Sequence, residues 1–225
     1  MTSNVPIRDA ATVIVLRDQA TDPKVLMGQR GKTAVFMPGK FVFPGGAIDQ
    51  NDHQVPVHGL PADTTAQLNE ESLIPAHAIA AAAVRELWEE TGQILGQHGE
   101  WTDAPQGWRG FAKSGHVPFA PFEFFFRAVT PEGRPRRFDA RFLLLEAEHL
   151  QSDIDDFSLA EDELSHLQWV PLHSVRQFNL PFITKVVLAE LEDRVANGPA
   201  GRAVPFFRND DEDRLVSRIG GAWPG

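Results

Sequence analysis

The sequence contains no cysteine among its 225 residues. This absence excludes disulfide bonds, cysteine-ligated zinc, iron–sulfur ligation and thiol nucleophiles, and it fits a cytoplasmic protein. No apolar run approaches the roughly 20 residues that a membrane-spanning helix needs. The first residues also lack the basic and apolar regions of a secretory signal. We therefore expect a cytoplasmic location and no membrane partner.

Basic residues are also fewer than acidic ones. The chain has 21 Lys and Arg against 31 Asp and Glu, which gives a formal net charge of −10. A nucleic-acid-binding surface normally needs an excess of positive charge, so we expect no nucleic-acid partner. An acidic protein repels an anionic substrate unless divalent cations and local arginines neutralise the repulsion. If the substrate is anionic, the composition favours a metal-dependent site.

The overall balance is that of an ordinary globular protein, with 42% hydrophobic and 23% charged residues. The length fits one elaborated domain, and because neither a repeat nor a linker interrupts the sequence, we expect a single domain over residues 1–225. Apolar runs predict strands at residues 11–16, 25–28, 122–129, 141–146 and 167–170. Helical periodicity and end signals predict helices over residues 75–92 and, near the C-terminus, 181–197.

The helix predicted over residues 75–92 carries a group of carboxylates. With residues 78–94 placed at about 100° per residue, the apolar stripe consists of Ala80, Ala83, Val84, Leu87, Thr91 and Ile94. Glu86, Glu89 and Glu90 form the neighbouring stripe, because residues three and four apart are adjacent on a helix. Adjacent carboxylates repel one another unless a cation lies among them, and oxygen ligands suit Mg²⁺ or Mn²⁺. Arg85 can contact Glu89 and orient it. A solvated acidic face is the alternative.

The segment Arg85-Glu86-Leu87-x-Glu89-Glu90-x-Gly92 resembles the second half of the Nudix box, and Phe43-Pro44-Gly45-Gly46 resembles the loop that opens it. The resemblance extends from about residue 11 to residue 171. It implies an α/β fold, the family's α/β/α sandwich with a mixed sheet, in which the box forms a loop–helix–loop. It also implies hydrolysis of a nucleoside diphosphate linked to another group, at its pyrophosphate.

The same resemblance implies roles for individual residues. Glu86, Glu89 and Glu90 would bind Mg²⁺ or Mn²⁺, which polarises the phosphate and activates a water for attack on phosphorus. One of these three glutamates would also serve as the general base. Glu163 is a second candidate for the base, because related enzymes can use a glutamate from a late loop. The alternative for Glu163 is an ordinary surface acid. Arg85 would hold the catalytic carboxylates in place.

The spacing inside the box departs from the family pattern. A short spacer normally separates the glycine loop from the helix, and a glutamate stands about two helical turns before the arginine. Here residues 49–74 form an insertion, and His77 occupies the glutamate position. The first part of the insertion, up to Glu71, is polar and lacks periodicity, so we expect a surface loop. The usual supporting glutamate is missing or is supplied from elsewhere, with Glu70 and Glu71 as candidates.

The sequence before the box bears on the substrate. Arg30, followed by Gly39 and then Gly45 and Gly46, resembles a motif of Nudix enzymes that cleave coenzyme A and its thioesters. The match is partial, because Val35 stands where that motif has a second arginine. The insertion also resembles a peroxisomal branch of coenzyme A diphosphatases. We therefore expect coenzyme A or an acyl derivative as substrate, with ADP-ribose or a nucleotide sugar as the alternative.

Coenzyme A carries a pyrophosphate and a 3′-phosphate, and arginine binds such groups through bidentate hydrogen bonds. The candidate substrate-binding residues are Arg30, Arg136, Arg137 and Arg141, with Gly45 and Gly46 of the loop. Ordinary surface arginine is the alternative. A different class of function also stays open, a catalytically silent Nudix-like module that binds a nucleotide or a partner protein. We expect a small nucleotide-type partner, and the oligomeric state is open, a homodimer included.

Overall fold

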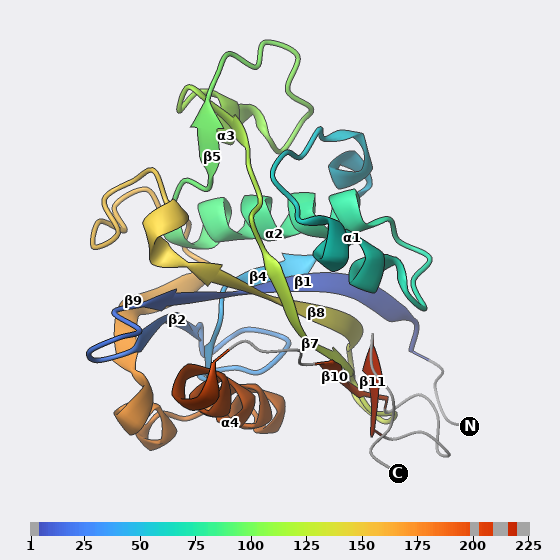
Figure 1. Ribbon diagram of the computed structural model, residues 1–225, viewed down its shortest axis with the longest axis vertical. Coiled ribbons are helices and arrows are strands. Elements are labelled where there is room, and N and C mark those ends of the chain that lie inside the picture. Colours follow the sequence, from blue (N-terminus) through green and yellow to red (C-terminus); the bar gives the residue numbers. More distant parts are fainter. Residues whose placement is uncertain (1–4, 199–202, 209–215, 220–225) are drawn as a thin grey trace.

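A mixed β-sheet separates two helical layers in the computed structural model, which describes residues 5–198, 203–208 and 216–219 (Figure 1). Its strands are β1 (Ile7–Arg17), β2 (Lys24–Arg30), β3 (Phe41–Val42), β4 (Gly45–Ala47), β7 (Glu123–Val129), β8 (Arg137–Glu146), β9 (Leu164–Pro171), β10 (Val204–Phe207) and β11 (Val216–Ile219). They lie in the order β11-β10-β7-β8-β1-β2-β3, while β4 also pairs with β1 and β9 with β2. β1 runs parallel to β8 and antiparallel to β2, so the sheet is mixed.

Helices cover both faces of this sheet, which confirms the predicted α/β/α sandwich (Figure 1). The helices are α1 (Ala62–Asn69), α2 (Ala76–Thr91), α3 (Arg109–Ala112) and α4 (Phe182–Asn197), with the 3₁₀ helices η1 (Gln50–Gln54), η2 (Ala147–His149) and η3 (Leu172–Gln177). A small separate sheet pairs β5 (Gly96–His98) with β6 (His116–Pro118). α2 and α1 lie on one face, and α4 lies on the other (Figure 1).

The two faces of β1 contribute to different apolar clusters. Val13 and Val15 belong to the cluster that contains α2, whereas Ile14 and Leu16 belong to the cluster that contains α4. Successive side chains of a strand point to opposite faces, so one continuous apolar run supports both layers. α4 confirms the helix predicted over residues 181–197.

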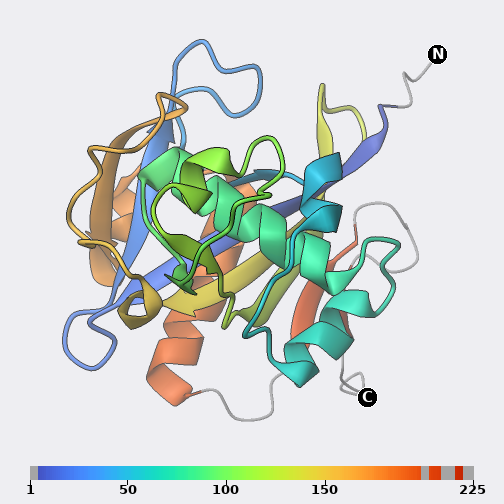
Figure 2. The same cartoon turned by 90° about the horizontal axis from the view of Figure 1, so that it is seen from above.

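The ends of α2 follow from local sequence signals. Pro75 is the residue before the first turn, and Gly92 ends the helix with a φ of 73°, in the left-handed region that glycine adopts readily. The predicted helix is therefore confirmed. The single apolar stripe was too narrow a prediction, because Ile79 and Ala82 are also fully buried. α2 packs against α1 and η1 as well as against the sheet (Figure 2).

The segment predicted as a surface loop, residues 49–71, is instead an ordered part of the outer layer. It contains η1 and α1, and the side chains of Asp52, Val55 and Leu68 are buried. The prediction was wrong because the segment has too few apolar residues to show a helical periodicity. A few buried side chains are nevertheless enough to hold the segment in place.

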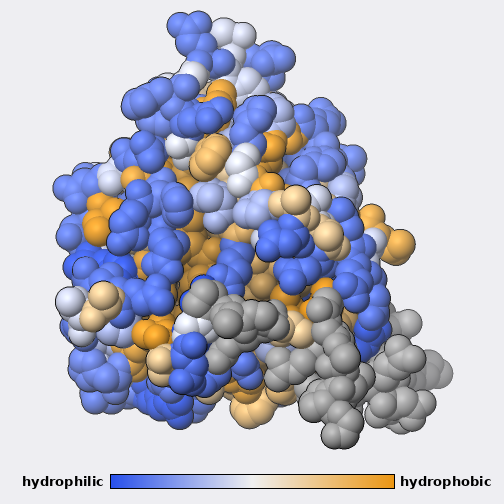
Figure 3. Space-filling model, in the orientation of Figure 1, coloured by the Kyte–Doolittle hydropathy of each residue, from blue (hydrophilic) through white to orange (hydrophobic). Residues whose placement is uncertain are grey.

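The exterior of the molecule is predominantly hydrophilic on the face seen in Figure 3, where apolar side chains show mainly across the middle. Within the described ranges, no helix combines the length and apolar character needed to cross a membrane. The largest buried apolar residues lie in the two clusters on either side of the sheet.

Candidate active site

Arg85 lies at the centre of a group of charged residues on α2. Its Nε and Nη2 donate to the two carboxylate oxygens of Asp52 at 3.0 and 2.9 Å, and Nη2 also donates to the Ala47 carbonyl oxygen at 3.0 Å. Its Nη1 donates to Glu86 at 2.8 Å and to Glu89 at 3.0 Å. All five N–H groups of a guanidinium are thereby used. Although burial opposes the charged form, the hydrogen bond with Asp52 and the nearby carboxylates raise the pKa of Arg85.

Glu86 is pressed against the glycine loop. A Cβ atom at Gly46 would lie 2.5 Å from the carboxyl carbon of Glu86, so only glycine leaves space for this side chain. Burial raises the pKa of Glu86 from 4.5 to about 7, despite the opposing charge of Arg85. The carboxyl group is therefore placed where a proton or a cation would relieve an unfavourable buried charge.

Glu90 is the most deeply buried of the three glutamates, with 1% of its surface exposed. Its Oε2 accepts a hydrogen bond from the Gly45 amide at 2.7 Å, while Oε1 is buried and has no hydrogen-bond partner among the described residues. Burial, together with the charge of Glu86, raises the pKa of Glu90 well above its usual range. Because buried polar atoms normally have partners, the orphaned oxygen fits a cation ligand.

Glu89 completes the acidic face of α2 and is the most exposed member, with 27% of its side chain accessible. Burial still raises its pKa above the usual value. In the described part of the chain, no three acidic or imidazole side chains are grouped so that they could hold a metal ion by themselves. Mg²⁺ does not require such a group, because it commonly binds one or two carboxylates and takes its other ligands from water and substrate phosphate.

Arg30 and Glu163 pair beside these glutamates. The Nη2 of Arg30 donates to Oε1 of Glu163 at 2.7 Å, and the side chain of Glu163 is 55% exposed. Besides burial, the charge of Glu163 contributes to the raised pKa values of Glu86 and Glu90. The structure thus brings Arg30 and Glu163 to the carboxylates of α2, although they come from β2 and from the loop before β9.

The three later arginines of the predicted substrate site lie elsewhere. Arg141 is buried and pairs with Asp9 and Asp139. Arg137 is buried at the start of β8 and donates from Nε to the Thr130 carbonyl oxygen at 3.0 Å. We therefore leave Arg137 and Arg141 out of the proposed site.

Arg136 is exposed in the turn between β7 and β8. The loop that follows Arg30 reaches the start of β8, next to this turn, because Phe36 contacts Phe138 with ring centroids 5.2 Å apart. Arg136 is therefore the only one of these three arginines that we keep as a candidate for a distant part of a long substrate.

Asp52 is the site residue that the sequence did not reveal. It takes the place against Arg85 for which Glu70 and Glu71 were the candidates. The carboxylate of Glu71 instead pairs with Arg208, so that part of the prediction was wrong. The short spacing of Asp52 from the glycine loop, six residues after Gly46, is the local signal that could have found it.

Comparisons with known proteins agree with this geometry. Residues 73–191 match the NUDIX domain family. The chain is also similar to "Putative nudix hydrolase 7" of Caenorhabditis elegans, with 32% identity over 176 residues, which cover 72% of this chain and 51% of that protein. The chain therefore belongs to the Nudix family, and it spans about half the length of this curated relative.

Solved structures show the same fold. A NUDIX hydrolase from Alicyclobacillus acidocaldarius is similar, with a TM-score of 0.64 and 26% identity, and the likeness covers 89% of this chain and 100% of that one. A MutT NUDIX hydrolase from Burkholderia pseudomallei has a TM-score of 0.50 at 16% identity, covering 83% of this chain and 98% of that one. Both likenesses support the Nudix fold.

Proposed function

We propose that this chain is a metal-dependent hydrolase that cleaves the pyrophosphate of a nucleoside diphosphate linked to another group. The observation that carries the proposal is the acidic face of α2 in a Nudix chain, where Glu90 has a buried oxygen without a hydrogen-bond partner in the part of the chain that the structure describes. Glu86, Glu89 and Glu90 would hold Mg²⁺ or Mn²⁺. When bound, such an ion polarises a phosphate and lowers the pKa of a water.

The residues around the metal ligands would orient the carboxylates and accept the proton of the attacking water. Arg85 orients Glu86 and Glu89, and the glycine loop holds Glu86 and Glu90 by close packing and by the Gly45 amide. Glu163 lies at the edge of the site with more than half of its side chain exposed, so it can accept a proton from the attacking water. Gly45 and Gly46 therefore contribute to substrate binding indirectly, because they position the carboxylates of Glu86 and Glu90.

Coenzyme A or an acyl derivative is the substrate that we propose. The buried Nε of Arg30 has no hydrogen-bond partner among the described residues, so it can donate to a phosphate oxygen. The exposed Arg136 lies in the turn just before the part of β8 that the loop after Arg30 contacts, which suits a substrate with phosphates at a distance from one another. ADP-ribose and nucleotide sugars are the competing substrates.

A substrate panel tests the proposal. The purified protein is given coenzyme A, acyl-coenzyme A, ADP-ribose and nucleotide sugars with Mg²⁺ or Mn²⁺, and again with EDTA, and the products are identified by mass. We expect 3′,5′-ADP and 4′-phosphopantetheine from coenzyme A, and no turnover without metal.

Two variants link this activity to the acidic face of α2. Glu89→Gln and Glu90→Gln should each lower turnover at least about 10²-fold, the scale of losing a major electrostatic element. Near-normal rates in both would contradict the metal site. Tight nucleotide binding without turnover would instead support the catalytically silent module.

A further inference from the structure

Gln93 lies just beyond the end of α2, and its polar side chain is fully buried. A buried side-chain amide needs partners for its N–H donors and for its oxygen. Both ends find them in the loop between η2 and β9. Gln93 Nε2 donates to the main-chain carbonyl oxygens of Asp153 at 3.2 Å and Asp156 at 2.9 Å. Gln93 Oε1 accepts from the hydroxyl of Ser152 at 2.7 Å.

We infer that Gln93 is a positioning residue for Glu163, because its amide holds the loop that carries Glu163 against the end of α2. This loop, residues 150–163, is hereafter the Glu163 loop. Figure 1 shows it in gold beside the end of α2. The inference rests on the proposed function, in which Glu163 accepts a proton from the attacking water.

The Glu163 loop and the acidic face of α2 carry charge of the same sign. The loop contains six acidic residues and no lysine or arginine, and arginines of β1 and β2 each pair with one of the six. Besides burial, the charge of Glu163 contributes to the raised pKa of Glu86 and of Glu90. Because like charges favour separation, uncharged contacts are needed to keep the loop in place, and the Gln93 amide supplies three of them.

Further contacts along the Glu163 loop connect Gln93 with Glu163. Leu159 packs against the turn that ends α2, where a Cβ atom at Gly92 would lie 3.0 Å from the Leu159 Cβ. The Glu161 amide donates to the main-chain carbonyl oxygen of Glu89 at 2.7 Å. Glu163 follows two residues later. The loop is therefore attached to α2 from Gln93 almost to Glu163, and its attachment begins at the Gln93 amide.

A purely structural role for Gln93 is the competing explanation, because buried polar groups that lose their partners destabilise a fold. Two variants of different severity address it. Gln93→Leu removes all three side-chain hydrogen bonds to the loop and keeps a side chain of similar size. Ser152→Ala removes one of the three, together with the bond that Ser152 Oγ accepts from the Ile94 amide at 3.0 Å. It serves if Gln93→Leu does not fold.

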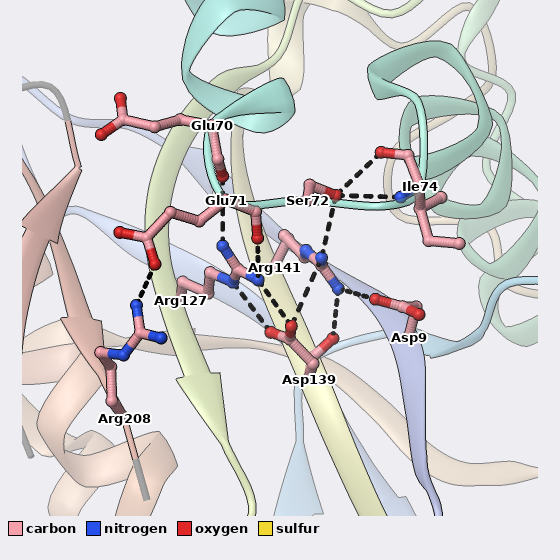
Figure 4. Close-up of polar contacts among 9 residues, drawn as sticks. All are labelled: Asp9, Glu70, Glu71, Ser72, Ile74, Arg127, Asp139, Arg141 and Arg208. Atoms are coloured by element: carbon pink, nitrogen blue, oxygen red, sulfur yellow. Dashed lines mark hydrogen bonds and ion pairs between the residues drawn. The ribbon is translucent and has the colours of Figure 1, made fainter. Parts of the chain in front are cut away.

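Ser72 at the end of the insertion provides a matched control for Ser152 (Figure 4). Its hydroxyl is also part-buried, donates to the carbonyl oxygen of Ile74 at 2.8 Å and accepts from the Ile74 amide at 3.2 Å. It further accepts from Arg141 Nη2 at 3.1 Å. Neither partner belongs to the Glu163 loop or to the acidic face of α2. Ser72→Ala therefore breaks comparable bonds without acting on Glu163.

Steady-state kinetics on the best substrate of the panel and Mn²⁺ binding without substrate compare the variants with the wild type, each at a temperature where it is folded. We expect Gln93→Leu to lower kcat about 10–100-fold, the scale of displacing a general base by about 1 Å, and Ser152→Ala to lower it less. KM should not rise and Mn²⁺ affinity should stay unchanged, because Arg30 and the α2 glutamates lie outside the loop. Ser72→Ala should keep the wild-type kcat.

Hydrogen exchange measures the position of the Glu163 loop without relying on activity. The Glu161 amide, which donates to α2, should exchange faster in Gln93→Leu than in the wild type, since the loop opens more often. In Ser72→Ala it should exchange at the wild-type rate. Wild-type exchange of this amide in a folded Gln93→Leu protein would overturn the inference.

A double variant tests whether Gln93 acts through Glu163. Gln93→Leu/Glu163→Gln should lose no more turnover than Glu163→Gln alone, and Ser152→Ala replaces Gln93→Leu in this comparison if the latter does not fold. Additive losses, a wild-type kcat in folded Gln93→Leu, or an equal loss in Ser72→Ala would each overturn the inference. A wild-type kcat in Glu163→Gln would overturn it too and leave the metal site intact. A wild-type protein that neither binds Mn²⁺ nor turns over any substrate would overturn the proposed function as well.

Discussion

Glu86, Glu89 and Glu90 share one side of α2 but meet three different environments. Glu90 is enclosed and has the Gly45 amide as its donor, whereas Glu86 is pressed onto Gly46 and Glu89 faces solvent in part. Burial raises all three pKa values. Without a cation, the protein therefore carries carboxyl groups whose charged form is disfavoured by burial.

This preference makes the stability of the metal-free protein depend on pH. Burial raises the pKa of Glu86 from 4.5 to about 7, so the folded state binds its proton more tightly than the unfolded chain does. The contribution of Glu86 to the free energy of unfolding is therefore fully present below pH 4.5 and is lost as the pH rises through about 7. Glu86→Gln cannot lose a proton, so it should become progressively more stable than the wild type across this range.

Thermal unfolding midpoints of Glu86→Gln and the wild type, measured in EDTA across this pH range, check the prediction. Taking the difference between the two proteins removes the effect of all other titrating groups. A difference that stays constant with pH would show that the Glu86 carboxyl group titrates alike in the folded and unfolded states.

At the scale of the element, the close approach of β4 to α2 sets the position of the Glu86 carboxylate, a proposed metal ligand. A Cβ at Gly46 would overlap the carboxyl group of Glu86. Gly46→Ala should therefore push the Glu86 side chain aside and lower kcat about 10²-fold, the scale of a 1 Å misplacement. The fold should survive, because the obstructing atoms are the far end of a side chain.

Gly110→Ala is the matched control, since a Cβ there would meet only Trp88 Nε1 at an ordinary 3.5 Å. Steady-state kinetics of the two variants decide the matter. Equal rates in both would mean that the Gly46 contact has no bearing on catalysis.

Elements differ in how far their sequence predicts them, and the reason is the distance to their partners. α2 was predicted well because Pro75, Gly92 and the apolar spacing are local signals. β8 was predicted to begin at residue 141, yet it begins at Arg137. Its first half alternates arginine and aspartate residues that are paired inside the structure, and such residues look like a turn in the sequence.

The candidate site divides in the same way. The helix glutamates, Arg85 and the glycine loop could be predicted because the motif spacing is local. Asp52 was missed, because its partners Arg85 and Trp108 are 33 and 56 residues away and only its spacing from Gly46 is local. The pairing of Arg30 with Glu163 spans 133 residues. Arg30 and Glu163 were each predicted as site residues, but their contact with each other could not be predicted from the sequence.

At the scale of the whole molecule, acidic residues outnumber basic ones, and several arginines are already engaged in ion pairs within the chain. Arg85, Arg127, Arg141 and Arg194 are buried against carboxylates of the chain itself. Arg30 differs in its position, because it lies beside the acidic face of α2, where its charge acts on Glu90. It is therefore the cation best placed to offset the repulsion of a phosphate.

This reasoning predicts a preference for the 3′-phosphate of coenzyme A. Dephospho-coenzyme A lacks that group, and losing a charge-assisted contact worth about 1.5–3 kcal/mol should lower kcat/KM roughly tenfold or more. Arg30→Gln should narrow the gap between the two substrates, and Arg136→Gln tests the other candidate in the same way. Equal kcat/KM values in the wild type, or faster cleavage of ADP-ribose, would refute coenzyme A as the substrate and leave the metal site intact.

The buried ion pair between Asp52 and Arg85 also has a consequence for the motions of the protein. If the first turn of the insertion lifted away, Arg85 would remain buried without its main counter-charge, which is a costly state. The insertion therefore cannot open as an independent flap above a site that stays assembled. We therefore expect its local unfolding and the loss of order among the proposed metal ligands to be one cooperative event, so that the first turn of the insertion and the proposed site share a single stability.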